Sequence, residues 1–106
     1  MYYVKITHTA EEDILSSVKY IADILKAPKA ANNLLDEIKK HEEILEHTPG
    51  IFPCVPNEYL ASMGFRFTIV KNYLMFYSIN EDEKTVVVHR FLYGHRDWIN
   101  ILAENQ

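Results

Sequence analysis

The side chains best suited to chemistry lie in the second half of the sequence. All three arginines occur there, and the stretch HRFLYGHRDW at residues 89–98 places two of them and two histidines around Gly94. The guanidinium group matches the planar geometry of phosphate and carboxylate groups. If the strands pair as expected below, one exposed face of a sheet carries a cluster of six residues: Arg66, Tyr77, Arg90, Tyr93, His95 and Arg96.

Three of these residues have the chemistry needed to cleave RNA without a metal ion. Such cleavage requires a base for the 2′-hydroxyl, an acid for the leaving oxygen and cations for the charge that develops on the phosphate. His95 would be the acid or base, and Arg66 and Arg96 would be the cations. The alternative is a binding surface whose arginines pair with carboxylates of a partner protein. Trp98 then either closes over the core or adds apolar surface for another chain.

Other kinds of site lack their usual residues. The five histidines show no paired spacing typical of metal ligands, and Cys54 is the only cysteine, which excludes an internal disulfide and a cysteine-based zinc site. There is also no glycine-rich phosphate loop and no serine nucleophile elbow. We therefore expect neither a metal ion nor a cofactor.

Composition limits the remaining choices. A chain of 106 residues with 48% apolar side chains predicts one domain over residues 1–106. A net charge of −4 argues against a general nucleic-acid binder, although a local arginine cluster could still serve one. The sequence has no charged-then-apolar leader and no apolar run of membrane-spanning length. We expect a cytoplasmic protein that does not contact membranes.

The first half of the sequence predicts a strand followed by two helices. Residues 2–7 alternate like a strand, and Thr9 with Glu12 forms a capping-box pattern that would start the first helix. Pro28 suits the first turn of a second helix that continues to about His47. The short connection between the two predicts an antiparallel helical hairpin. The proline-rich segment 49–62 reads as an irregular loop.

The second half switches to the two-residue period of strands. Three strands are expected, at 65–70, 73–79 and 85–93, followed by a short helix from about Arg96 to Ala103. A two-residue turn at Lys71-Asn72 would put Phe67 opposite Phe76 and Ile69 opposite Leu74 on a core face.

The same turn puts Arg66 opposite Tyr77 and Thr68 opposite Met75 on the other, functional face. Arg90 joins that face, beside Tyr73, if the second turn spans four residues; a five-residue turn would put it against Leu74 in the core. Burying an unpaired guanidinium is costly, so we favour the first register.

These elements make an α+β domain. Its sheet is mainly antiparallel, with an N-terminal strand, a helical hairpin on one face, a three-strand meander and a short C-terminal helix. The apolar C-terminal helix is also compatible with a homodimer.

Four segments make the chain resemble the RelE/ParE superfamily, the toxins of type II toxin–antitoxin (plasmid stabilisation) modules. They are ITHTAEEDI, AANNLLDEI, GFRFTIVKNYLMFY and HRFLYGHRDW, and together they span nearly the whole chain. The resemblance implies the fold described above and a bacterial protein that arrests growth until an antitoxin binds it. Arg66, Tyr77, Arg90, Tyr93 and Trp98 would then contact the target or the antitoxin.

The two branches of the superfamily differ in target. RelE-like members cut mRNA in the ribosome, whereas ParE-like members poison DNA gyrase. Arg66 and Arg96 match basic positions of the nucleases, but Leu74 stands where a basic residue is expected, and Leu102 lies in the region of the C-terminal tyrosine. The pattern R-x-L-Y-G-x-R-D at 90–97 is closer to the ParE branch, in which histidine commonly replaces Tyr93. We favour the ParE-like function; the alternatives are a RelE-like, metal-independent endoribonuclease and a non-toxic member that only binds its antitoxin.

Overall fold

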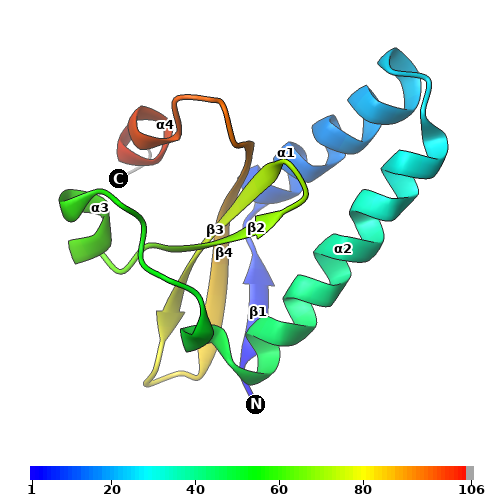
Figure 1. Cartoon of the computed structure of the whole chain (residues 1–106). Helices are drawn as coiled ribbons and strands as arrows, with labels where there is room; N and C mark the ends of the chain where they lie inside the picture. The colour runs from blue at the N-terminus through cyan, green and yellow to red at the C-terminus, as the bar shows by residue number, and fades with distance from the viewer. Residues whose placement is uncertain (105–106) are drawn as a thin grey trace.

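The protein is built on one four-stranded sheet flanked by helices (Figure 1). A computed structural model describes residues 1–104. The strands are β1 (Tyr3–Ile6), β2 (Arg66–Val70), β3 (Tyr73–Asn80) and β4 (Thr85–Tyr93). The helices are α1 (His8–Lys19), the π-helical turn η1 (Tyr20–Ile24), α2 (Pro28–His47), the 3-10 turn η2 (Pro49–Ile51), α3 (Glu58–Ser62) and α4 (Trp98–Glu104).

The strands lie in the order β1-β4-β3-β2, with β1 parallel to β4 and the other pairs antiparallel. The β2–β3 register is confirmed: Phe67 pairs with Phe76, and Arg66 pairs with Tyr77. Lys71 takes a φ of 58° in the tight turn between these strands, the left-handed conformation that such turns require. The predicted α+β architecture is therefore confirmed.

The expected position of Arg90 is wrong. Arg90 pairs with Phe76 rather than Tyr73, and Tyr93 takes the place opposite Tyr73. Tyr77 pairs with Val88, so a β-bulge interrupts the register between Phe76 and Tyr77. The second turn does span four residues, but they are 81–84 rather than 80–83, since Asn80 pairs with Thr85. The bulge then inserts one extra residue in the middle of β4, which counting from the turn could not reveal.

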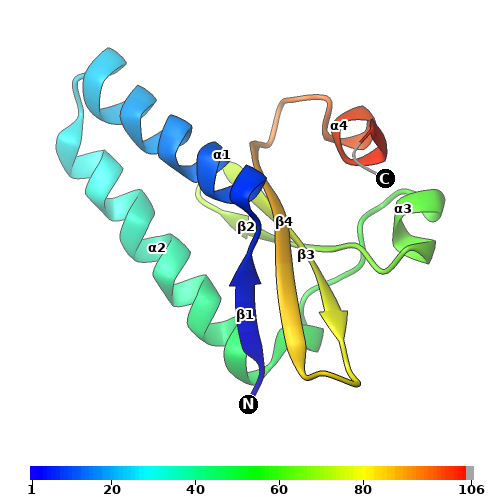
Figure 2. The ribbon, with the colours of Figure 1, turned by 180° about the vertical axis from the view of Figure 1, so that it is seen from behind.

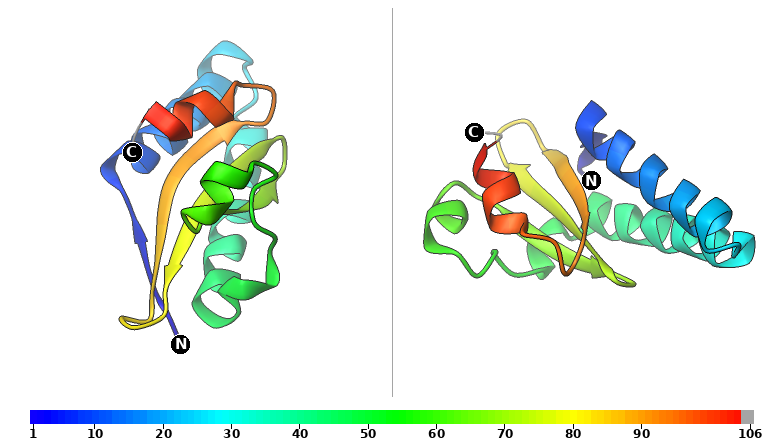
Figure 3. Two further views of the ribbon diagram at one scale, coloured as in Figure 1. Left: turned by 90° about the vertical axis from the view of Figure 1, so that its left-hand side faces the viewer. Right: turned by 90° about the horizontal axis from the view of Figure 1, so that it is seen from above.

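Both faces of the sheet are buried, whereas the sequence predicted one open face. The helical hairpin of α1 and α2 covers the face that carries Met75, Tyr77, Val88 and Phe91. The opposite face carries Phe76 and packs against α3 and α4 (Figure 3). Thr68, expected on the functional face, is only 2% exposed, and Ile69, expected in the core, is 61% exposed.

The first helix begins two residues earlier than its capping box predicted. The N-cap is Thr7, whose hydroxyl accepts a hydrogen bond from the Ala10 backbone N–H, and Thr9 lies inside the helix. Thr7 also donates from its hydroxyl to the carbonyl of His89. One side chain therefore both starts α1 and fixes it to β4.

The segment 49–62, predicted as an irregular loop, contains the short helix α3. Asn57 caps it by accepting a hydrogen bond from the Leu60 N–H, and Leu60 is fully buried. At the other end of the chain, α4 buries Leu102 in the same cluster and leaves Ile99 39% exposed. The apolar side of α4, which suggested a homodimer, thus packs largely within the chain, and the homodimer stays a prediction.

Over residues 1–104, no helix combines the length and apolar character needed to cross a membrane. Within the same residues, no group of three or more histidine, cysteine, aspartate or glutamate side chains is placed to hold a metal ion.

Candidate functional site

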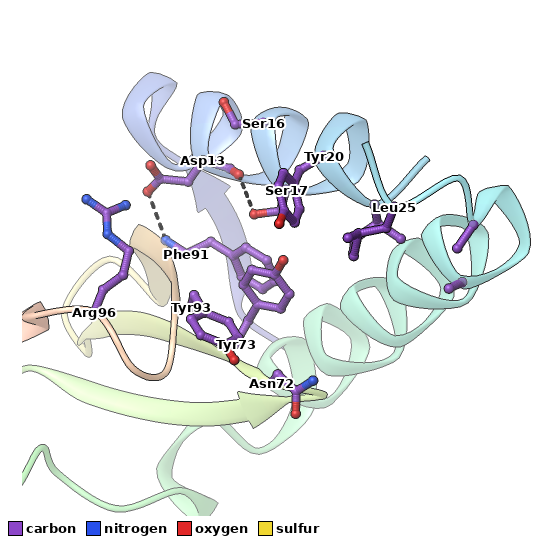
Figure 4. A pocket seen from close by; sticks show the side chains of 13 residues that line it. Asp13, Ser16, Ser17, Tyr20, Leu25, Asn72, Tyr73, Phe91, Tyr93 and Arg96 are labelled. Atoms are coloured by element: carbon purple, nitrogen blue, oxygen red, sulfur yellow. Dashed lines mark hydrogen bonds between the residues drawn. The ribbon is translucent and has the colours of Figure 1, made fainter. Parts of the chain in front are cut away.

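A groove of about 920 Å³ opens between the tip of the helical hairpin and one end of the sheet (Figure 4). We call it the tyrosine groove. Its hairpin side comes from α1, η1 and the start of α2, and its sheet side comes from the β2–β3 turn and the ends of β3 and β4. The residues that define it are Asp13, Ser17, Tyr20, Ile21, Leu25, Asn72, Tyr73, Phe91, Tyr93 and Arg96.

A series of aromatic rings runs from the core to the surface along the sheet side. The ring of Tyr73 stacks on Phe91 with centroids 4.9 Å apart and planes 11° apart. Tyr93 meets Tyr73 edge-on at 5.8 Å, and His95 lies 5.2 Å from Tyr93. Phe91 is buried, whereas Tyr93 is 42% exposed. The packed inner rings hold Tyr93 in place, so the groove presents a rigid aromatic surface.

The π-helical turn supplies the facing wall. Tyr20 and Leu25 are 52% and 55% exposed, and both line the groove. A π-helical turn inside a helix is rare and often occurs at functional sites. Lys26, which follows it, has a φ of 55° and lets the chain reverse into α2.

Gly94 allows the chain to leave β4 beside the β2–β3 turn. Its N–H donates to the carbonyl of Asn72, and a Cβ at this position would lie 3.3 Å from that oxygen. The N–H of Arg96 then donates to the carbonyl of Tyr93, which closes a turn. This turn places the exposed side chain of Arg96 at the groove. A side chain here would crowd that carbonyl, so the close backbone approach favours glycine.

Arg90 is not part of an open binding surface. Its guanidinium donates to both carboxylate oxygens of Asp13 on α1, at 2.7 Å and 2.9 Å, and the pair is largely buried. The Asp13 carboxylate also accepts from the Phe91 N–H at 3.0 Å. Strand β1 pairs with β4 only as far as Val88, so it does not extend to Phe91. The Asp13 carboxylate accepts the Phe91 N–H in place of a neighbouring strand. The ion pair and its hydrogen bonds raise the pKa of Arg90 above its usual value.

Arg66 and Tyr77 also have structural roles. Arg66 donates to the backbone carbonyls of Gly50 and Phe52 and so holds the segment after α2 against β2. Tyr77 is fully buried and donates its hydroxyl to the carbonyl of Pro49, and burial raises its pKa to about 12. The expectation that Tyr77 lies on an exposed face is therefore wrong.

Comparison with known proteins identifies the family. A model of the ParE toxin of type II toxin–antitoxin systems (parDE) matches residues 4–98. The chain belongs to the ParE toxin family. The superfamily suggested by the four sequence segments is thereby confirmed, and the branch is the one that the 90–97 pattern favoured.

Solved structures agree with the fold of this ParE-family toxin. A chain of a chromosomal ParDE toxin–antitoxin system from P. aeruginosa superposes with a TM-score of 0.69 at 17% identity, over 88% of this chain and 96% of that one. A RelE–RelB complex from Pyrococcus horikoshii OT3 gives 0.58 at 18% identity, over 90% and 97%. The isolated E. coli RelE toxin gives 0.54 at 13% identity, over 99% and 97%. No curated protein sequence matches this chain.

The three residues predicted for a nuclease do not meet in this ParE-family toxin. Arg66 lies level with Tyr77 and Val88 across the sheet. His95 and Arg96 follow Tyr93, which lies about five residues further along β4, and that separation corresponds to roughly 15 Å at the usual rise of a strand. Arg66, whose guanidinium donates to the carbonyls of Gly50 and Phe52, therefore lies apart from His95 and Arg96.

Trp98 starts α4 and packs against the buried residues on the Phe76 face of the sheet. Its ring lies 5.3 Å from Phe76. Asp97 precedes the helix and accepts a hydrogen bond from the Asn100 side chain at 2.6 Å. Trp98 thus closes over the core, the first of its two predicted roles.

Sequence reasoning missed Asp13, Tyr20 and Leu25. Asp13 falls three residues after Ala10 and four before Ser17, on the side of α1 that faces the sheet. A carboxylate at such a position requires a cationic partner, and this requirement could have linked Asp13 to Arg90. The π-helical turn has no comparable signal, because its sequence continues the apolar period of α1.

Proposed function

We propose that this ParE-family toxin arrests bacterial growth by binding DNA gyrase, and that the tyrosine groove is the surface that makes the contact. Family membership supports the ParE-type target. The observation that carries the choice against mRNA cleavage is the separation of Arg66 from His95 and Arg96 across the sheet. The alternative, a RelE-like endoribonuclease, would have to work without one of its cations.

The chemistry of the groove suits a protein partner. Tyrosine and arginine are enriched at the energetically dominant positions of protein interfaces. Tyr20 and Tyr93 are partly exposed, the ring of Tyr73 backs Tyr93, and Arg96 adds a cation to the groove. Asp13 adds little negative charge because Arg90 neutralises it. A segment with apolar side chains and a carboxylate would fit these groups.

The remaining predictions about partners follow from the same role. A cognate antitoxin would hold the toxin inactive, and both would act in the bacterial cytoplasm, where DNA gyrase works. Neither a cofactor nor a membrane would be needed.

The test is induction of the toxin in a bacterial host, followed by assays for growth, DNA breaks and transcript integrity. We expect growth arrest with gyrase-linked DNA breaks and intact transcripts. Tyr93→Ala and Arg96→Ala should each reduce toxicity at least about tenfold, the size of effect typical of interface hot spots. Tyr59→Ala is the matched control, because Tyr59 is 61% exposed on α3, outside the groove.

Two results would reject the proposal. Transcripts cut on translating ribosomes, with DNA intact, would establish the nuclease alternative. Absence of any growth effect from a folded protein would instead support a non-toxic family member that binds only its antitoxin.

A further inference from the structure

Four of the eight lysines surround the tyrosine groove. Lys19, Lys26 and Lys29 belong to the tip of the helical hairpin, and Lys71 belongs to the β2–β3 turn. Each is exposed and is the immediate chain neighbour of a residue that lines the groove. Figure 2 shows the tip of the hairpin projecting beyond the sheet. We call these four residues the lysine rim.

The charge of the chain is divided unevenly between the rim and the rest of the molecule. Residues 19–30 and 71–72 hold the four lysines and one acidic residue, Asp23, so their net charge is +3. Because the whole chain carries −4, the remaining residues carry −7. Such a distribution of charge turns one end of a protein toward a polyanion. The net charge of the whole chain therefore does not describe this end.

Two of the rim lysines occupy backbone conformations that disfavour lysine. Lys26 has a φ of 55° and Lys71 a φ of 58°, in the left-handed region where glycine and asparagine fit at lower cost. Lys84 has a similar φ of 51°, but its ammonium group pairs with the Glu81 carboxylate at 3.5 Å. In the part of the chain that the structure describes, neither Lys26 nor Lys71 forms an ion pair. Backbone strain at a lysine without a partner inside the molecule points to a partner outside it.

The positions of the rim lysines suit the backbone of DNA. Double-stranded DNA carries one negative charge per about 1.7 Å of its axis, so phosphates are available to cations on both walls of the groove at once. A peptide segment rarely presents carboxylates at such a density. Lysine is a compact charge on a flexible stem, and it contacts phosphate without the planar pairing that arginine makes. Contacts of this kind position a protein on DNA and carry no sequence information.

We propose that the lysine rim contacts the phosphates of double-stranded DNA, while the tyrosine groove contacts protein. The inference rests on the proposed function in naming which DNA, namely the duplex that DNA gyrase holds. In this arrangement a toxin bound to the enzyme also touches the DNA on which the enzyme acts. An acidic protein segment is the competing partner for the rim, because it offers the same sign of charge.

The test measures binding of the purified toxin to a short, labelled DNA duplex by fluorescence anisotropy over a series of sodium chloride concentrations. We expect binding at low salt that weakens as the salt is raised. The logarithm of the association constant should fall with the logarithm of the salt concentration with a slope of roughly −2 to −4, because each phosphate contact contributes about −0.9. Two duplexes of unrelated sequence should bind equally, since the contacts involve only the backbone.

Matched variants locate the contact. Lys26→Asn combined with Lys71→Asn should weaken DNA binding at low salt about tenfold or more and make the slope less steep by about 2. Asparagine tolerates a positive φ, so the urea midpoint of this variant should not fall. Lys39→Gln combined with Lys40→Gln removes the same two charges from exposed positions of α2 outside the rim and should weaken DNA binding less than about twofold.

Absence of duplex binding at low salt, or equal losses in the two double variants, would overturn the inference. Binding of a glutamate-rich peptide in place of the duplex, lost in the rim variant, would also overturn it and assign the rim to an acidic protein. The assay contains no gyrase, so its result is independent of the proposed target. Rim-dependent DNA binding without gyrase-linked DNA breaks in cells would support the rim and reject gyrase, whereas gyrase-linked breaks without DNA binding would do the reverse.

Discussion

Replacing Asp13 by asparagine should lower the free energy of unfolding by about 3 kcal/mol, because it breaks a largely buried ion pair from one side. The side chains of Arg90 and Asp13 are only 15% and 13% exposed. Asparagine can still accept from the Phe91 N–H, but its amide would present hydrogen atoms to the Arg90 guanidinium where the carboxylate presents a second oxygen. A charge-assisted hydrogen bond contributes roughly 1.5–3 kcal/mol, and the guanidinium left behind adds a desolvation cost.

Such a loss is large compared with the roughly 5–15 kcal/mol that stabilises a small domain. Urea unfolding followed by circular dichroism measures it directly, and the melting temperature should fall by roughly 15 °C. The control is Glu12→Gln in the same helix. Glu12 pairs with His8, but the two side chains are 65% and 87% exposed, so the change should stay within about 0.5 kcal/mol.

A double-mutant cycle separates the ion pair from other effects. Arg90→Met alone removes the guanidinium, and the combination with Asp13→Asn should be less destabilising than the sum of the single changes by about 1–3 kcal/mol. Two results would contradict this role of Asp13 in joining α1 to β4. One is that Asp13→Asn lowers the free energy of unfolding no more than Glu12→Gln does. The other is that the effects of Asp13→Asn and Arg90→Met are additive.

Two further predictions concern stability. Burial lowers the pKa of both His41 and His89, so the unfolded chain binds protons more readily than the folded chain below about pH 6.5. The urea concentration at the denaturation midpoint should therefore fall as the pH drops from 7.5 to 5.5. In a His41→Gln, His89→Gln double variant the midpoint should depend less on pH. If the midpoints of the two proteins fall in parallel, these histidines are not the cause. Tyr77→Phe removes the donor to the Pro49 carbonyl inside the core and should cost about 1–2 kcal/mol. Tyr93→Phe, at an exposed tyrosine, should change the free energy of unfolding in urea by less than about 0.5 kcal/mol. If Tyr77→Phe and Tyr93→Phe lower the free energy of unfolding equally, the buried hydrogen bond of Tyr77 contributes nothing.

The order of elements and the β2–β3 register could be predicted because local patterns determine them. A tight turn with Phe67 and Phe76 facing each other fixes one hairpin. The β3–β4 register could not be predicted, since the bulge places His89 where its ring bonds Ser78 at 2.7 Å and packs on Phe65. These contacts join residues far apart in the sequence, and no periodicity records them.

The candidate site was predictable only in part, for a related reason. Arg66 and Tyr77 were correctly expected to share a face, but that face is covered by the hairpin. The opposite face is also covered, by α3 and α4, and the five residues of α3 are too few to show a helical period. Tyr93 and Arg96 were found because they surround a glycine at the end of a strand, where side chains commonly reach solvent.

Helix α1 links the stability of the fold to the tyrosine groove. Asp13 of α1 and Tyr20 of η1 line this groove, whereas Ile14 and Leu15 do not. The helix is fixed to the sheet at its start by Thr7 and in its middle by Asp13. Beyond Asp13 the helix leads into the π-helical turn, which forms one wall of the tyrosine groove. Breaking the Asp13–Arg90 ion pair should therefore reduce toxicity as well as stability.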